Sequence, residues 1–159
     1  MLVSQPHFAA EVFEPSTMLT LHGRPAPSDA DLAVVIPAMV KLVSENELAR
    51  SLVITDGGAP STAQRKRLFD AIGGRSDRVR NAVVSDAASV RFVISAMSLV
   101  VDGIRAFAPD EINSALAYLE YSPREIVACA SKLRTIAKSL PAGRVLTFDR
   151  AIDHLSPAR

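Results

Sequence analysis

The stretch "DGGAPSTAQR", Asp56 to Arg65, is where the sequence comes nearest to a reactive or ligand-gripping loop. Gly57 and Gly58 permit a tight turn, and Ser61 is placed to cap a following helix with Gln64 three positions later. Free backbone N–H groups at such a helix start can bind an anion. The stretch lacks both the Walker loop and the three spaced glycines of a dinucleotide fingerprint. A capped strand-to-helix connection is therefore the favoured interpretation, and a phosphate site is the alternative.

Two aspartates follow apolar runs and form the best acidic pair in the chain. Asp56 ends "SLVITD" and Asp86 ends "NAVVSD". Ligands of open α/β sheets bind at the carboxyl ends of the strands, so both side chains are candidates for a binding edge. Because neither has a histidine or lysine companion in the sequence, we expect them to cap loops.

The sequence offers no clear metal site, cofactor site or catalytic nucleophile. His7, His22 and His154 lie in separate segments without a second ligand at metal spacing, so we expect no metal site and no cofactor. Cys129, the single cysteine, excludes an internal disulfide and lies on an apolar helix face, where packing is the expected role. No base is near it or Ser61 in the sequence, and we assign no catalytic residue.

Basic residues gather in the middle of a chain whose net charge is only +1, with 18 basic and 17 acidic side chains. A balance of this kind gives no overall field for a nucleic acid, and few aromatic side chains accompany the cluster, so we expect no nucleic-acid partner. A solvated helix face is the favoured interpretation, and a docking surface for an acidic partner is the alternative. The cluster consists of Arg65, Lys66, Arg67, Arg75, Arg78, Arg80 and Arg91.

Positioning these residues requires an α/β domain. The length of 159 residues and 48% hydrophobic content fit one globular unit. The pattern predicts a mixed, largely parallel sheet of four or five strands flanked by helices, with central strands at 52–55 and 82–84. The expected strands are 8–13, 17–23, 51–56, 81–86 and 104–108. The first expected helix follows Ser28 as its N-cap, with Asp31 three positions later, and carries an apolar stripe from Leu32 to Val43; the others are 62–72, 87–101, 109–120 and 123–140.

The last part of the chain, 122–159, is predicted to be a helical extension of a first unit, 1–121. Ser122, Pro123 and Glu125 form the start of a helix, and a narrow apolar stripe runs from Ile126 to Leu140. The stripe must pack on something. We expect it to cover the helix at 87–101, and the alternative is that it or the tail "RVLTFDRAIDHL" docks on another chain.

No segment approaches the apolar length that a membrane span needs, and the start "MLVSQPHFAAEVFEP" lacks the pattern of a signal peptide. We therefore expect a cytoplasmic protein without membrane insertion.

The order of segments is similar to that of a known family. It runs from "LTLHGRPAPSDADL" through "RVRNAVVSDAASVRFVISAM" to "IRAFAPDEINSALAYLE", which holds Phe107, Asp110, Glu111, Ala115 and Leu119. Over residues 8–120 the chain resembles the STAS-like (SpoIIAA-like) proteins, the superfamily of bacterial anti-sigma-factor antagonists. The resemblance implies a mixed sheet flanked by helices that binds a partner protein or small ligand without catalysis.

In the antagonists a phosphorylatable serine begins the helix after the third strand, and the resemblance places Ser61 and Thr62 there as candidate phosphorylation positions. The family pattern of Asp-Ser-x-Gly-Leu type around that serine is replaced here by "GGAPSTAQR". This departure from the family pattern argues against regulation by phosphorylation.

Two functional hypotheses follow. The first is a regulatory module that binds a partner protein through the Asp56–Thr62 loop and the adjacent helix, with a homo-oligomer as a further arrangement. The second is a protein that binds, or weakly turns over, a small anionic or lipid-like ligand at the same loop. An apolar lining beside the loop would favour the second, and a closed core with a flat outer face would favour the first. Both use the same candidate residues: Asp56, Gly57, Gly58, Ser61, Thr62, Arg65 and Asp86.

Overall fold

A six-stranded mixed sheet forms the centre of the computed structural model, which describes residues 3–13, 15–99, 101–140 and 144–155. The strands follow one another across the sheet in chain order. β1 pairs antiparallel with β2, and β2 with β3, whereas the remaining neighbours are parallel. The α/β class and the largely parallel sheet are thus confirmed. The strands are β1 (Val3–Gln5), β2 (Phe8–Phe13), β3 (Thr17–His22), β4 (Ala49–Thr55), β5 (Val79–Ser85) and β6 (Ile104–Phe107).

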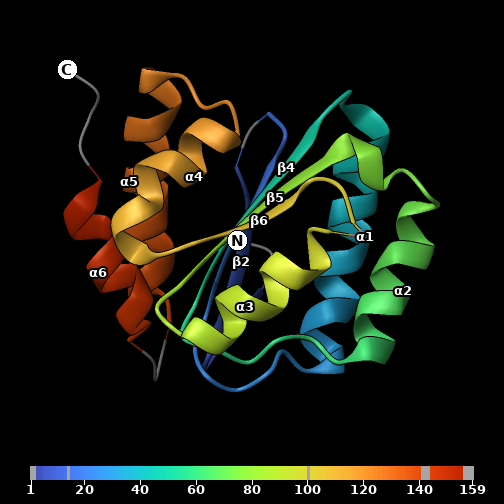
Figure 1. Ribbon diagram of the computed structural model, residues 1–159, viewed down its shortest axis with the longest axis horizontal. Coiled ribbons are helices and arrows are strands. Elements are labelled where there is room, and N and C mark those ends of the chain that lie inside the picture. The colour runs from blue at the N-terminus through green and yellow to red at the C-terminus, as the bar shows by residue number, and fades with distance from the viewer. Residues whose placement is uncertain (1–2, 14, 100, 141–143, 156–159) are drawn as a thin grey trace.

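Three helices connect the parallel strands and lie on one face of the sheet. They are α1 (Asp29–Glu45), α2 (Thr62–Ile72) and α3 (Ala88–Met97), and a short 3₁₀ helix at Ser76–Arg78 precedes β5. Each crossover advances the sheet by one strand in the same direction. Because such crossovers are right-handed, all three helices must share a face, as Figure 1 shows.

The C-terminal part of the chain returns over the opposite face. A 3₁₀ helix at Pro109–Glu111 leads into α4 (Ile112–Tyr118), α5 (Pro123–Lys138) and α6 (Leu146–His154), which lie together across the sheet from α1 and α2 (Figure 1). Residues 141–143, at the start of the tail, lie outside the described residues. The segments 1–121 and 122–159 share one core, because α5 and α6 cover strands of the first segment.

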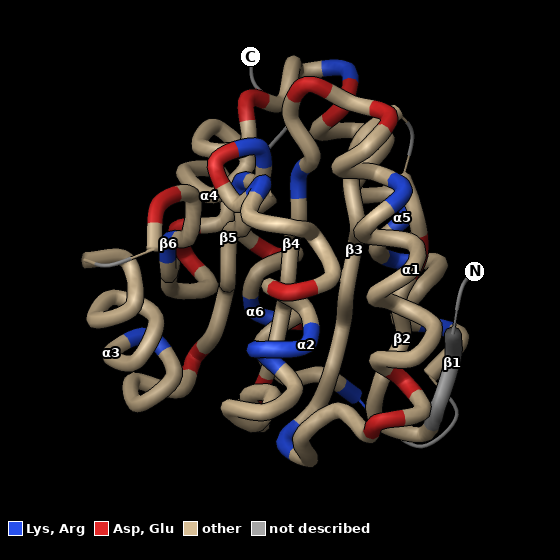
Figure 2. The backbone as a smooth tube through the Cα atoms, turned by 90° about the vertical axis from the view of Figure 1, so that its right-hand side faces the viewer, with Lys and Arg blue, Asp and Glu red and all other residues tan. Residues whose placement is uncertain are grey.

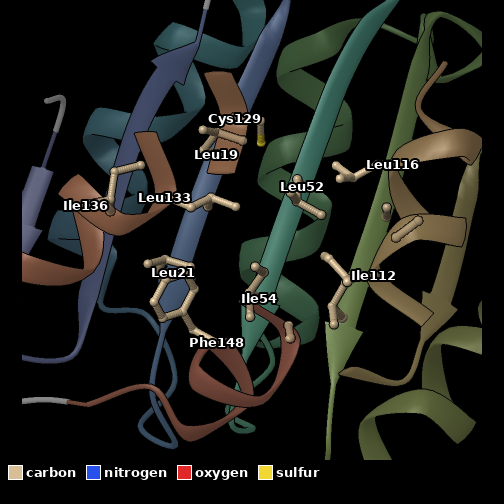
Figure 3. Close-up of a cluster of buried hydrophobic side chains, with 14 of the residues drawn as sticks. Leu19, Leu21, Leu52, Ile54, Ile112, Leu116, Cys129, Leu133, Ile136 and Phe148 are labelled. Atoms are coloured by element: carbon tan, nitrogen blue, oxygen red, sulfur yellow. The ribbon is translucent and has the colours of Figure 1, made fainter. Parts of the chain in front are cut away.

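Alternate residues of the central strands point into that core. Leu19, Leu21, Leu52 and Ile54 are almost fully inaccessible and meet side chains of α4, α5 and α6 (Figure 3). The predicted central position of 52–55 and 82–84 is confirmed, since β4 and β5 have a neighbouring strand on both sides. The large apolar residues that these helices contribute include Ile112, Leu116, Leu133, Ile136 and Phe148.

A buried arginine fixes the start of α5. Arg50 donates from Nη2 to Oε1 of Glu125 at 2.9 Å, and its guanidinium lies 4.6 Å from the ring centre of Tyr121. Hydrogen bonds from Ser122, and then the contact with Arg50, lower the pKa of Glu125 to about 2. Glu125 therefore stays ionised and links the C-terminal helix to β4.

The capping boxes predicted at Ser61 and Ser122 are present, and a third begins α1 at Ser28. The side chains of Ser28, Ser61 and Ser122 accept the backbone N–H three residues later, at 3.1, 3.2 and 3.3 Å. Each box needs only a local sequence, so the helix starts were predictable. Pro37 lies inside α1 on an exposed position.

Two expectations about the elements are wrong, and one strand was missed. β1 was not predicted, and the helix expected at 87–101 is shorter, because α3 ends at Met97. The stripe of α5 does not cover α3, because the two helices lie on opposite faces of the sheet (Figure 1). α5 instead packs against β2 and β3, and no residue within Ala88–Met97 is buried. Among the described residues, no helix is long and apolar enough to cross a membrane.

Candidate functional site

A cavity of about 200 Å³ lies between the sheet and the three crossover helices. Its walls are mostly apolar and come from all three: Leu32, Val35 and Met39 of α1, Leu68 and Phe69 of α2, and Val90, Val93, Ile94 and Met97 of α3. The cavity exists because α2 and α3 are not closely packed against the sheet. α2 has a single buried residue, Ile72, and α3 has none.

The floor of the cavity carries polar side chains at alternate strand positions. Side chains two apart on a strand share a face, so Thr20 and His22 of β3 face the same side as Ser51 and Thr55 of β4. The parallel register places His22 beside Thr55, and Ser51 beside Asn81. The floor is thus polar at both ends, with valines between.

The mouth of the cavity is formed by the loop that the sequence singled out. Gly57, Gly58, Ala59 and Pro60 line it, together with Arg65 at the start of α2. Gly58 has a φ of +68°, and a Cβ atom there would lie 2.3 Å from the carbonyl oxygen of Arg24. Glycine is therefore required where this loop crosses the segment after β3.

The guanidinium of Arg65 closes the loop onto the helix. Nη1 donates to the carbonyl of Pro60 at 2.6 Å, and Nη2 donates to the hydroxyl of Thr62 at 3.1 Å. An arginine has five N–H donors, so this one retains donors for a group at the cavity mouth. These contacts tie the loop, the start of α2 and the cavity mouth into one unit.

His22 is the most buried titratable group of the cavity wall, with 4% of its surface exposed. Its Nδ1 lies 3.1 Å from the carbonyl oxygen of Gly23 and 3.0 Å from Oγ1 of Thr55. Burial lowers its pKa, opposed by the Gly23 hydrogen bond and the charge of Asp56. The imidazole is therefore neutral at neutral pH.

Asn81 is a second polar group of the wall. Its Oδ1 atom is buried and has no hydrogen-bond partner among the described residues. A buried carbonyl without a partner costs about 1–3 kcal/mol. The oxygen has almost no accessible surface, so its missing partner is a cost to the fold and not a contact open to a bound molecule.

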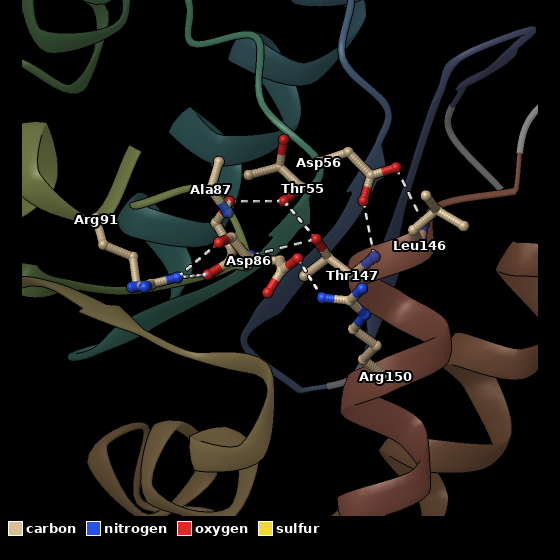
Figure 4. A network of polar contacts seen from close by, with 9 residues as sticks. Thr55, Asp56, Asp86, Ala87, Arg91, Leu146, Thr147 and Arg150 are labelled. Atoms are coloured by element: carbon tan, nitrogen blue, oxygen red, sulfur yellow. Dashed lines mark hydrogen bonds and ion pairs between the residues drawn. The ribbon is translucent and has the colours of Figure 1, made fainter. Parts of the chain in front are cut away.

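The two aspartates predicted at the sheet edge both contact α6 (Figure 4). The carboxylate of Asp56 accepts the backbone N–H of Leu146 at 3.0 Å and of Thr147 at 2.7 Å, and so caps that helix. Asp86 pairs with Arg150. The expectation that both would cap loops is wrong: Asp56 caps a helix that begins 90 residues further along the chain, and Asp86 forms an ion pair instead.

The remaining candidates divide between the cavity and the outer surface. Gly57, Gly58 and Arg65 line the cavity, whereas Ser61 and Thr62 are exposed at the helix start and are not among its lining residues. His22, Thr55 and Asn81 were missed. The available signal was the placement of polar residues at alternate positions in the apolar strands "TMLTLH" and "SLVIT".

The basic cluster is largely paired within the chain. Lys66 pairs with Asp70, and Arg67 with Asp29. The guanidinium of Arg91 donates to the carbonyls of Ser85 and Asp86. Figure 2 shows basic positions interleaved with acidic ones across this side of the molecule. Such pairing fits the solvated face that the sequence favoured.

No grouping of three or more His, Cys, Asp or Glu side chains within the described ranges could hold a metal ion. Comparisons with family models, curated proteins and solved structures gave no match.

Proposed function

We propose that the protein binds a small, mostly apolar molecule in the cavity beneath α1, α2 and α3. The observation that carries the proposal is an apolar-walled cavity beside the 57–60 loop, with buried polar groups in its floor. Apolar walls with a few placed polar groups are typical of small-molecule sites. Of the two hypotheses from the sequence, this favours the ligand-binding one.

The cavity volume limits the size of the ligand. An engineered apolar cavity of about 150 Å³ binds benzene, so about 200 Å³ suits a molecule somewhat larger than that. A body of about ten carbon atoms, such as a naphthalene ring system, matches the space. The protein then acts by binding alone, as the STAS-like resemblance implies, and that family assignment is itself part of the proposal.

Isothermal titration of the protein with 2-naphthol tests the proposal. Val53 lies in the middle of the cavity floor, so Val53→Phe should place a ring in the cavity and abolish binding. Val127→Phe is the matched control, because Val127 is an exposed residue of α5 on the opposite face. Binding that is equal in wild type and Val53→Phe, or absent from wild type, would contradict the proposal.

A protein-interaction function is the second candidate, and exposed apolar side chains on and just after α3 favour it. Phe92 of α3 is 75% exposed, and Leu99, which follows the end of α3, is 85% exposed. Large apolar side chains that gather in water mark interaction sites. If this candidate is correct, a Phe92→Ser, Leu99→Ser double variant should bind 2-naphthol as tightly as wild type. It should lose the binding of a partner protein or, where the partner is a second copy of the chain, the self-association that sedimentation measures.

A further inference from the structure

We propose that the ligand carries a hydroxyl group that donates a hydrogen bond to Nε2 of His22, so that the site selects small apolar alcohols or phenols. This inference rests on the proposed function and names the chemical class of its ligand.

The hydrogen bonds around Nδ1 fix the tautomer of His22. The carbonyl oxygen of Gly23 can only accept, so Nδ1 must carry a proton to bond it. Oγ1 of Thr55 donates its own hydrogen to the carbonyl of Gly57, and so faces Nδ1 as an acceptor as well. With the proton on Nδ1, Nε2 of the neutral ring is an acceptor.

Nothing in the described part of the chain donates to that acceptor. No hydrogen bond to Nε2 is formed there, although His22 as a residue is only 4% exposed and lines the cavity. The ring of Phe8, 6.0 Å away between centres, adds an apolar neighbour. A hydrogen bond from a ligand to this acceptor would strengthen binding, whereas an apolar ligand group that covers it would weaken binding, because the acceptor would lose water without gaining a partner.

The charge of the ligand follows from the same acceptor. A carboxylate inside the cavity would place its oxygens against Nε2, whereas a hydroxyl supplies the missing donor. Arg65, at the mouth, is the group that would instead favour an acid.

Three probes of nearly the same shape test the inference by titration at neutral pH. 2-Naphthol should bind at least about tenfold more tightly than 2-methylnaphthalene, since covering an unpaired acceptor with an apolar group costs about that factor or more. 2-Naphthoate should bind more weakly than 2-naphthol. Equal binding of 2-naphthol and 2-methylnaphthalene, or tightest binding of 2-naphthoate, would overturn the inference while leaving the proposed function intact. If none of the three binds, the proposed function itself fails.

Two variants of His22 assign the preference to Nε2. Gln can place an amide oxygen near the position of Nε2, whereas Asn reaches only the position of Nδ1. His22→Gln should therefore keep the preference for 2-naphthol over 2-methylnaphthalene, and His22→Asn should reduce it to within about twofold, a difference of less than about 0.5 kcal/mol. A preference that survives in His22→Asn would overturn the role of Nε2. Should either variant not fold, the comparison of probes on wild type still decides the ligand class.

Discussion

Replacing Asp56 by alanine should destabilise the protein without weakening 2-naphthol binding. The carboxylate accepts two backbone N–H groups at the start of α6, from Leu146 and Thr147. Loss of a helix cap costs about 1 kcal/mol, and a hydrogen bond to a charged group contributes about 1.5–3 kcal/mol. Because the carboxylate is only half-buried, we expect a loss of about 2 kcal/mol in the free energy of unfolding.

Urea denaturation measures this loss, and Asp86→Ala is the matched control. Asp86 also contacts α6, but its ion pair with Arg150 is largely exposed, with 50% and 60% of the two side chains accessible. Exposed ion pairs contribute about 0–1 kcal/mol, so the control should unfold close to wild type.

Two results would refute this reasoning. An Asp56→Ala variant as stable as Asp86→Ala would show that the cap does not hold α6. A variant that unfolds like wild type yet binds 2-naphthol several-fold more weakly would return Asp56 to the binding site, where the sequence alone had placed it.

Three further substitutions have defined outcomes. Hydrogen bonds from Ser122 help to lower the pKa of Glu125 from 4.5 to about 2, so the stabilisation by its carboxylate is present above pH 4.5 and is lost as the pH falls toward 2. Glu125→Gln should therefore lower the free energy of unfolding by about 1–2 kcal/mol at neutral pH, and urea unfolding at a series of pH values should show the difference between variant and wild type vanish near pH 2. Gly58→Ala should lower the stability by about 2 kcal/mol or more, because of its positive φ and the contact with the neighbouring backbone, measured as a fall in Tm. Asn81→Val should raise the stability by about 1 kcal/mol, since it removes a buried unpaired oxygen, and an unchanged or lower Tm would contradict this.

Much of the fold was predictable because its signals are local. The caps at Ser28, Ser61 and Ser122 depend on residues three positions apart, and the apolar runs that become β4 and β5 are continuous in the sequence. Once strands and helices alternate, the handedness of the crossovers fixes the face on which the helices lie.

The packing of the C-terminal helices was not predictable in the same way. The stripe of α5 shows that the helix must be covered, but it carries no information on which apolar surface covers it. After the crossovers occupy one face of the sheet, the other face remains apolar, and α5 packs there rather than on α3.

The site was predicted only at its mouth. Gly57, Gly58 and Arg65 stood out because a glycine turn before a helix is a local pattern. His22 and Thr55 are 33 residues apart, and their contact depends on the register of β3 against β4. The cavity itself results from how loosely α3 rests on the sheet, which no short pattern in the sequence records.

An NMR titration of ¹⁵N-labelled protein with 2-naphthol tests the binding site most directly. A ligand in the cavity should produce saturable shifts in the amides of Thr20, Val53 and Val83, which form its floor, with little change at Val127 on the opposite face. The same titration of Val53→Phe should leave the floor resonances unmoved. Shifts that do not saturate, or that are confined to residues outside the cavity, would contradict a ligand-binding function for this protein.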